Sequence, residues 1–204
     1  MSTTAPAPSP NASTDLAARR EAERAKYVTL ASREGSTYGS TNHGAKAIPI
    51  IQRLKPRLVI DFGCGRNDLV RALRRLGIDG LGVDFAFPEA DVPDPMHQTR
   101  LVSGVADVVT SFDALEHLLP EDVDAVLAEM RRIARRRGHF IFSVCTRPSR
   151  HTVAGANLHP TVQPLAWWLE HIGRVGVVSS HRAEGRFIVG RFKPAQADGG
   201  CGCA

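Results

Sequence analysis

The stretch Val59–Leu69 constrains the fold of this chain more than any other part of the sequence. An apolar, β-branched run ends there in an acid, Asp61, and is followed by Gly63, Cys64 and Gly65. A helical pattern comes next, so the stretch predicts a buried strand, a glycine turn and the start of a helix. Glycine lets backbone approach a ligand closely, and a helix N-terminus offers unpaired N–H groups. Together these features indicate a site for a nucleotide-type cofactor.

Asp61 separates two classes of cofactor. A carboxylate this close to the turn would repel the pyrophosphate of a dinucleotide, whereas it complements the cationic methionine end of S-adenosylmethionine. Asp84 ends the next apolar run and suits a carboxylate that accepts hydrogen bonds from two ribose hydroxyls. Asp68 also argues against NAD, because the dinucleotide fingerprint has glycine or alanine at that position.

With these residues the chain resembles the class I S-adenosylmethionine-dependent methyltransferases over residues 58–143, and more faintly in its C-terminal part. In that family the equivalents of Asp61 and of the two glycines hold the methionine end, and the equivalent of Asp84 holds the ribose. The resemblance therefore assigns Asp61, Asp84 and the turn Gly63–Gly65, Cys64 included, to the cofactor.

Two departures from the family pattern follow the turn. The family's third glycine corresponds to Asn67, and asparagine tolerates left-handed backbone better than most residues. Residues 85–89 leave no room for the usual helix before the apolar segment 90–92, which we expect to be a strand. By resemblance Asp91 would meet the adenine amino group. Phe85 is expected either to lie against the adenine or to pack in the core.

A third motif, Asp113-Ala-Leu-Glu116-His117, follows the apolar strand 107–111. Its three polar residues share one face if the segment is a helical turn, which makes them candidates for acid–base chemistry or for a divalent cation. The motif resembles one in ubiquinone-pathway O-methyltransferases and small-RNA 2′-O-methyltransferases, whose equivalent groups coordinate a metal. In the wider family such residues more often brace the loop. We assign Glu116 and His117 to catalysis and Asp113 to the cofactor, with a cation as the alternative.

The polar segment 146–159 follows the strand expected over 139–144. A loop at the carboxyl ends of parallel strands is where acceptor recognition belongs. His159 is a candidate general base there, and the alternative is that it structures the loop. A hydroxyl or amine acceptor needs a base or metal to lose its proton, whereas an acceptor activated by its own conjugation needs less. The sequence does not identify the acceptor.

The order of apolar segments predicts an α/β domain over residues 15–194. We expect a Rossmann-like, doubly wound, seven-stranded sheet that is mostly parallel and ends in an antiparallel hairpin. Residues 15–56 are expected to form N-terminal helices and a lid near the site. The Ser-, Thr-, Ala- and Pro-rich residues 1–14 predict a disordered arm, and residues 195–204 a flexible tail.

Composition narrows the partners. The chain has 204 residues, of which 43% are hydrophobic and 23% charged, as in a single soluble domain. The net charge of +5 leaves a nucleic-acid partner open, but the densest basic group, 131–137, lacks interleaved aromatic residues, so a small-molecule acceptor is favoured. We see no secretory leader and no membrane span, which predicts a cytoplasmic protein. The sequence does not indicate an oligomeric state.

Two rival functions share parts of this pattern. A nucleotide- or NAD-binding oxidoreductase has the same strand–turn–helix unit, but Asp61 and Asp68 argue against it. A non-catalytic cofactor-binding module would keep the fold without activity. The sequence therefore predicts an S-adenosylmethionine-dependent methyltransferase as the leading function.

Overall fold

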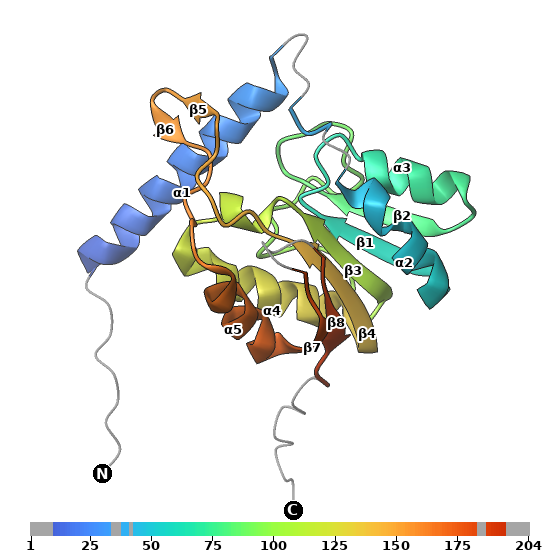
Figure 1. The fold of residues 1–204 in the computed structure, drawn as a ribbon. Helices are drawn as coiled ribbons and strands as arrows, with labels where there is room; N and C mark the ends of the chain where they lie inside the picture. The colour runs from blue at the N-terminus through green and yellow to red at the C-terminus, as the bar shows by residue number, and fades with distance from the viewer. Residues whose placement is uncertain (1–9, 34–37, 41–42, 183–186, 195–204) are drawn as a thin grey trace, which may run out of the picture.

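The computed structural model describes residues 10–33, 38–40, 43–182 and 187–194, with side chains from residue 15 onward. These residues form a sheet in the order β2-β1-β3-β4-β8-β7 with helices on both faces (Figure 1). The first four strands in this order are parallel, and β8 and β7 are antiparallel. The predicted parallel sheet with a C-terminal antiparallel hairpin is confirmed. The strands are β1 (Leu58–Phe62), β2 (Asp79–Val83), β3 (Ala106–Phe112), β4 (Ala134–Ser143), β7 (Gly176–Ser180) and β8 (Ile188–Phe192).

The sheet has six strands among the described residues, and the expected count of seven is wrong. Residues 90–92 form only an isolated parallel bridge between Val92 and Val83. The run after Asp84 is too short for a helix and a full strand. It stays an irregular loop, held to the end of β2 by the Asp84 N–H on the Val92 carbonyl (3.1 Å) and the Val92 N–H on the Gly82 carbonyl (3.0 Å).

Two helical layers cover the sheet (Figure 1). One face carries a 3-10 helix and two α-helices, and the other carries two α-helices. A long N-terminal helix lies beside a small hairpin at the edge of this sandwich (Figure 1). The helices are α1 (Pro10–Ala31), η1 (Gly44–Ala47), α2 (Ile48–Leu54), α3 (Asp68–Arg75), η2 (Leu115–His117), η3 (Pro120–Asp122), α4 (Val123–Ile133) and α5 (Leu165–Val175), and the hairpin is β5 (Thr152–Val153) with β6 (Ala156–Asn157).

The burial of β1 on both faces explains the layers. Ile60 and Phe62 are fully buried in one cluster with Leu127 of α4, whereas Val59 is buried in another with Leu73 of α3. Successive side chains of a strand point to opposite faces, so an unbroken apolar run is typical of a parallel strand covered on both sides.

The junction between α4 and β4 differs from its prediction. The apolar face of residues 121–135 predicts a helix over that range, closed by Gly138 and followed by the strand expected over 139–144. In the structure α4 ends at Ile133 and β4 begins at Ala134. A register shift against β3 follows, with Arg137 in left-handed backbone (φ 68°). Residues 135–137 thus lie between two residues, Ala134 and His139, that pair with β3.

At the N-terminus α1 begins at Pro10, earlier than the expected start near residue 15. Proline suits the first turn of a helix, where its missing N–H has no partner to lose. Residues 1–9 of the expected arm, 195–204 of the expected tail and parts of the expected lid (34–37 and 41–42) lie outside the described residues.

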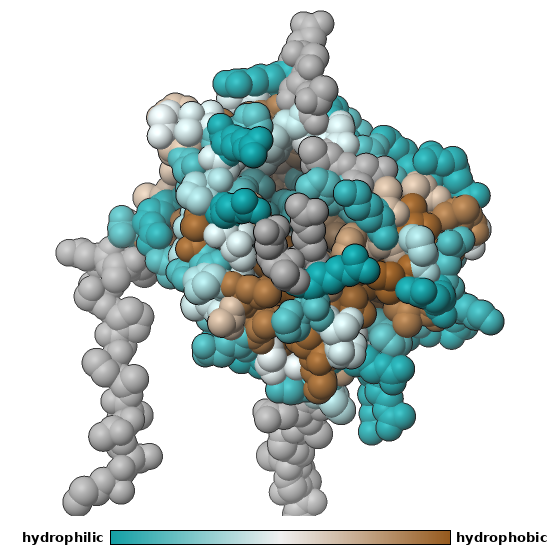
Figure 2. Space-filling model, viewed as in Figure 1, coloured by the Kyte–Doolittle hydropathy of each residue, from teal (hydrophilic) through white to brown (hydrophobic). Residues whose placement is uncertain are grey.

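Among the described residues, no helix combines the length and the apolar character that crossing a bilayer requires. The face of the molecule in Figure 2 carries hydrophilic side chains with hydrophobic ones between them. The cytoplasmic location stays a prediction.

Candidate active site

One large cavity opens where the four parallel strands end. Its volume is about 1220 Å³. Ligands of open α/β sheets bind at this edge, and a site for one small ligand usually measures about 300–1,000 Å³. The cavity therefore has room for a cofactor and a second molecule. The residues that line it from the strand ends are Asp61, Gly63, Asp84, Phe112 and Ser143.

The turn after β1 has no room for a side chain at Gly63 or Gly65. Gly63 and Gly65 have left-handed backbone, with φ of 70° and 52°. A Cβ at Gly63 would lie 2.4 Å from the Ala114 Cβ, and one at Gly65 would lie 2.7 Å from the Gly39 carbonyl oxygen. The Gly63 N–H donates to the Val83 carbonyl (2.8 Å), which ties the turn to the end of β2. The two glycines thus let three segments meet beside the cavity.

Asn67 adopts left-handed backbone (φ 63°), as its place at the family's third glycine predicts. Unlike glycine, it also has a side chain that forms hydrogen bonds. The amide nitrogen donates to the Glu89 carbonyl (2.9 Å) and to Asp91 Oδ2 (2.9 Å). Asn67 therefore fixes the irregular loop that replaces the missing strand.

Asp91 does not line the cavity, and its expected contact with adenine is corrected. Its carboxylate accepts hydrogen bonds from the Gly82 N–H (2.9 Å), Arg74 (2.8 Å) and Asn67. Burial opposes ionisation of Asp91, but the hydrogen bonds from Asn67 and Arg74 outweigh it and hold the pKa of this carboxyl below its usual value. The shortened loop turns Asp91 toward β2.

Asp61 and Asp84 both line the cavity. Asp61 is 5% exposed and accepts a hydrogen bond from the Thr110 hydroxyl (2.6 Å). Burial raises its pKa to about 7, against the effect of Thr110. Asp84 accepts the N–H groups of Gly65 (3.1 Å) and Ala86 (2.9 Å), and burial raises its pKa as well. The structure thus brings both carboxyls to one cavity, and their contacts with a cofactor stay a prediction.

Cys64 and Phe85 also line the cavity. Burial raises the pKa of the Cys64 thiol, so this group is not a thiolate at neutral pH. The Phe85 ring meets Tyr27 edge-to-face, with 6.4 Å between centroids, and the Arg24 guanidinium lies 5.3 Å from its centroid. Phe85 is thus part of the cavity wall.

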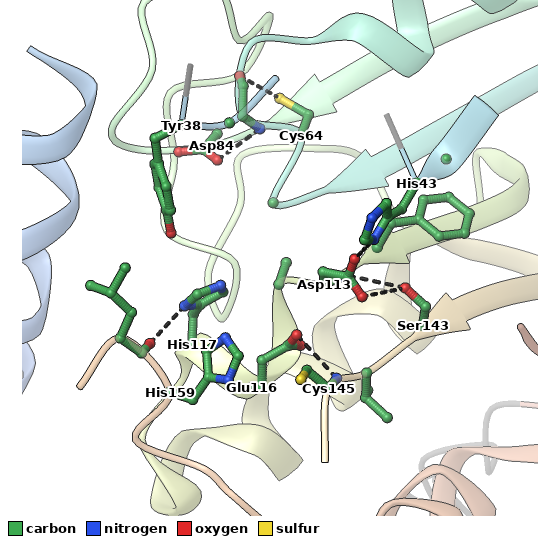
Figure 3. A pocket seen from close by; sticks show the side chains of 18 of the residues that line it. Tyr38, His43, Cys64, Asp84, Asp113, Glu116, His117, Ser143, Cys145 and His159 are labelled. Carbon is green, nitrogen blue, oxygen red and sulfur yellow. Dashed lines mark hydrogen bonds and ion pairs between the residues drawn. The ribbon is translucent and has the colours of Figure 1, made fainter. Parts of the chain in front are cut away.

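Glu116, His117 and His159 converge in the cavity (Figure 3). One ligand atom of each lies within 4.8 Å of the others. Glu116 is fully buried, and its Oε1 accepts the Cys145 N–H (3.0 Å). Its Oε2 is buried without a hydrogen-bond partner in the described part of the chain. Burial raises the pKa of Glu116 to about 8.

The two histidines hold their protons on the same ring atom. His117 Nδ1 lies 2.7 Å from the Leu158 carbonyl oxygen, and His159 Nδ1 lies 2.7 Å from the Arg147 carbonyl oxygen. A carbonyl only accepts, so each Nδ1 carries a proton, and on the neutral ring the lone pair is then on Nε2. Burial lowers the pKa of His117 to about 4, and its ring is neutral near pH 7.

Asp113 does not join this group, contrary to the expectation that residues 113, 116 and 117 share a face. It precedes η2 in left-handed backbone (φ 50°), which turns its side chain away. Its carboxylate accepts the Ser143 hydroxyl (2.9 Å) and pairs with His43. Figure 3 shows Asp113 with His43 and Ser143, apart from the three residues Glu116, His117 and His159.

Sequence reasoning missed Tyr27, and it placed His43 only within a lid. Tyr27 comes from α1 and lines the cavity, where its hydroxyl lies 3.1 Å from His117 Nδ1. No motif marks either residue, because each reaches the site through tertiary packing. A tyrosine on the apolar side of an N-terminal helix is the only signal the sequence offers.

Comparison with known proteins agrees with this fold and cavity. The family model described as "Methyltransferase domain" matches residues 42–183, more than half of the chain. The chain belongs to this family, and it is a member of the class I S-adenosylmethionine-dependent methyltransferases. A search of curated proteins found no match.

Solved structures share the fold at low sequence identity. The PH0226 protein of Pyrococcus horikoshii is 16% identical over 81% of this chain and 95% of its own, with a TM-score of 0.61. The 1,6-didemethyltoxoflavin-N1-methyltransferase of Burkholderia thailandensis, solved with 1,6-didemethyltoxoflavin and S-adenosylhomocysteine, is 17% identical over 94% and 93%, with a TM-score of 0.59. A TehB-like SAM-dependent methyltransferase of Corynebacterium glutamicum is 19% identical over 88% and 99%, with a TM-score of 0.54.

Replacing Gly63 by alanine is expected to lower the free energy of unfolding by about 2–4 kcal/mol, because left-handed backbone and overlap with Ala114 both penalise the new methyl group. Urea denaturation measures this loss. Gly77→Ala is the matched control, since its φ is also positive (77°) but nothing lies within 4 Å of an added Cβ. Equal losses in the two variants would contradict the crowding at Gly63.

The affinity for S-adenosylhomocysteine is expected to rise up to about tenfold between about pH 6 and about pH 8. The pKa of Asp61 is raised to about 7, so its carboxyl is mostly protonated at the lower pH and meets the ligand's ammonium group as a carboxylate at the higher one. Calorimetry in buffers of different ionisation enthalpy should show proton release on binding below pH 7. Asp61→Asn should bind weakly at both pH values, and a flat wild-type profile would refute the pairing.

Proposed function

We propose that this protein transfers a methyl group from S-adenosylmethionine to a hydroxyl or amine of a small molecule. One observation carries the proposal. A single cavity is lined both by Asp61 and Asp84 and by Glu116, His117 and His159, whose ligand atoms lie within 4.8 Å of one another. Membership of the methyltransferase family supports S-adenosylmethionine as the donor. The group formed by Glu116, His117 and His159 supports an acceptor that must lose a proton.

Asp61, Asp84 and the turn Gly63–Gly65 bind and orient the donor. Asp61 would accept the ammonium group of the methionine end, and Asp84 would accept the ribose hydroxyls. The turn Gly63–Gly65 allows the ligand close to backbone N–H groups. When bound, S-adenosylmethionine supplies a methyl carbon on a sulfonium that is already electrophilic. The protein therefore has to align the acceptor and exclude water.

The Glu116–His117–His159 group also fits a divalent cation. Its donor set is two imidazole nitrogens and one carboxylate oxygen, all within 4.8 Å of one another. Glu116 Oε2 is buried without a partner in the described part of the chain, which is costly unless a ligand meets it. Two imidazoles favour Zn²⁺, Fe²⁺ or Ni²⁺ over Mg²⁺. A bound cation would lower the pKa of an acceptor hydroxyl.

This ligand set differs from the one that the sequence suggests, because His159 replaces Asp113. Without a cation the same residues would act as acid and base. His117 is a poor base near neutral pH because its pKa is about 4. His159, with its Nε2 lone pair beside the cavity, is then the candidate for proton removal.

The structure also bears on a nucleic-acid acceptor. The densest basic residues, 135–137, lie near the amino end of β4, whereas Ser143 at its carboxyl end lines the cavity. The basic group therefore does not lead into the cavity, which favours a small molecule.

Calorimetric titration with S-adenosylhomocysteine, NAD and ATP tests the donor. Asp84→Ala is expected to weaken S-adenosylhomocysteine binding about 10–100-fold, because two ribose hydroxyls lose a charged acceptor. Asp79→Asn is the control, since Asp79 lies at the opposite, exposed end of the same strand. Binding of NAD without S-adenosylhomocysteine would overturn the proposed donor.

Measurements of metal binding and of methyl transfer together test the proposed cation site of the Glu116–His117–His159 group. The protein dialysed against Zn²⁺ is expected to retain one ion per chain by elemental analysis, and Glu116→Gln should lower the affinity at least about tenfold by loss of an anionic ligand. Asp113→Asn should keep the wild-type affinity, because Asp113 lies outside the ligand set. Transfer of labelled methyl groups to a small-molecule extract should stop with a chelator. Chelator-insensitive transfer and an ion-free protein would rule out the cation.

A further inference from the structure

Tyr27 brings the N-terminal helix into the site. It lies outside the stretch that matches the family model, yet it is buried and lines the cavity. Its ring meets His117 and Phe85 edge-to-face, with centroid distances of 5.4 and 6.4 Å. Tyr27 therefore lies between a residue of the cofactor wall and a member of the Glu116–His117–His159 group.

The Tyr27 hydroxyl and His117 share one acceptor. The hydroxyl donates to the Leu158 carbonyl (2.8 Å), and His117 Nδ1 lies 2.7 Å from the same oxygen. The hydroxyl and His117 Nδ1 are 3.1 Å apart. Burial raises the pKa of Tyr27, so its phenol remains a donor at neutral pH. The three groups form a closed triangle in which Leu158 is the fixed acceptor.

This triangle decides which nitrogen of His117 is available in the cavity. With the proton held on Nδ1, the lone pair is on Nε2. A hydrogen bond from Nδ1 to a carbonyl is how proteins fix the tautomer of a ligating or catalytic histidine, and the groups behind such a bond orient it. Without the phenol, the Leu158 carbonyl would be held by His117 alone.

We propose that Tyr27 is a positioning residue that fixes the His117 ring and its Nδ1–H tautomer through the Leu158 carbonyl. The use made of Nε2 rests on the proposed function, whereas the tautomer is a property of the protein alone. By this inference α1 is part of the active site, and the functional unit begins before the stretch that the family model covers.

Other contacts hold α1 in place without the phenol. Arg19 pairs with Glu121 (2.7 Å), Arg20 Nε donates to Asp122 (2.9 Å), and Lys26 donates to the Asn157 carbonyl (3.3 Å). Removal of the hydroxyl alone should therefore leave the helix docked. Tyr27→Phe keeps the ring contacts and removes only the hydrogen bond.

Long-range ¹H–¹⁵N NMR of the histidine rings tests the inference on metal-free, cofactor-free protein. The His117 signals, identified by their loss in His117→Gln, should show the Nδ1–H tautomer in the wild type and a mixture in Tyr27→Phe. Arg19→Gln, which loosens α1 without touching the triangle, should keep the wild-type tautomer. An Nε2–H tautomer in the wild type, or an unchanged tautomer in Tyr27→Phe, would overturn the inference. Lower thermal stability with an unchanged tautomer would also do so, because Tyr27 would then only pack.

Binding of Co²⁺ gives a second readout. Tyr27→Phe is expected to weaken Co²⁺ binding roughly tenfold and to change its visible absorption, as loss of a supporting hydrogen bond does at other metal sites. Affinity for S-adenosylhomocysteine should stay unchanged. If the wild type binds no Co²⁺ but the NMR result is as expected, the proposed cation fails and the positioning role stands. Unchanged Co²⁺ affinity in Tyr27→Phe, where the wild type binds it, would count against the positioning role.

Discussion

The left-handed backbone between β1 and α3 is the constraint on which the site depends. Gly63, Gly65 and Asn67 all have positive φ, and together they reverse the chain within a few residues of Asp61. The reversal leaves Asp61 at the end of a buried strand and facing the cavity. The turn is so tight that Ala114 and Gly39 occupy the space of the absent side chains. The segment after β3 and the segment before η1 are thereby drawn to the same cavity, so a local backbone requirement sets the global arrangement of the site.

The sequence predicts well wherever one segment carries its own signal. The apolar run of β1, the glycines after it and the hairpin at the end of the sheet are local patterns, and Asn67 adopts the backbone that its position requires. It predicts poorly wherever distant segments compete. The turn at Asp113 is set by Ser143 on the neighbouring strand, and His159 reaches Glu116 from a loop that no spacing rule describes. The arginines after α4 favour a helix by themselves, yet they lie in an irregular part of β4 between two residues, Ala134 and His139, that pair with β3.

Burial raises the pKa of three carboxyls that line the cavity, those of Asp61, Asp84 and Glu116. Asp61 and Asp84 lie in the part of the cavity that we assign to the cofactor, and Glu116 lies in the part that we assign to the acceptor. Burial disfavours the ionised form of all three. A buried carboxylate without a counter-charge lowers the stability of the folded chain. A ligand that supplies a cation offsets this cost and stabilises the folded chain in proportion to its binding. The same electrostatic feature underlies both proposals, an ammonium group beside Asp61 and a divalent cation beside Glu116.

The loop that replaces the missing strand has a further consequence for β2. Three outward backbone groups of this outermost strand have partners: Arg74 donates to the Gly80 carbonyl (2.7 Å), Asp91 accepts the Gly82 N–H, and the Val92 N–H binds the Gly82 carbonyl. An outermost strand with open N–H and C=O groups is a template on which another chain can add a strand and aggregate. Asp91 and Arg74 therefore block the addition of a strand from another chain at this edge. A chain with the same short loop but without these two residues would leave the edge of β2 open to pairing with a second copy.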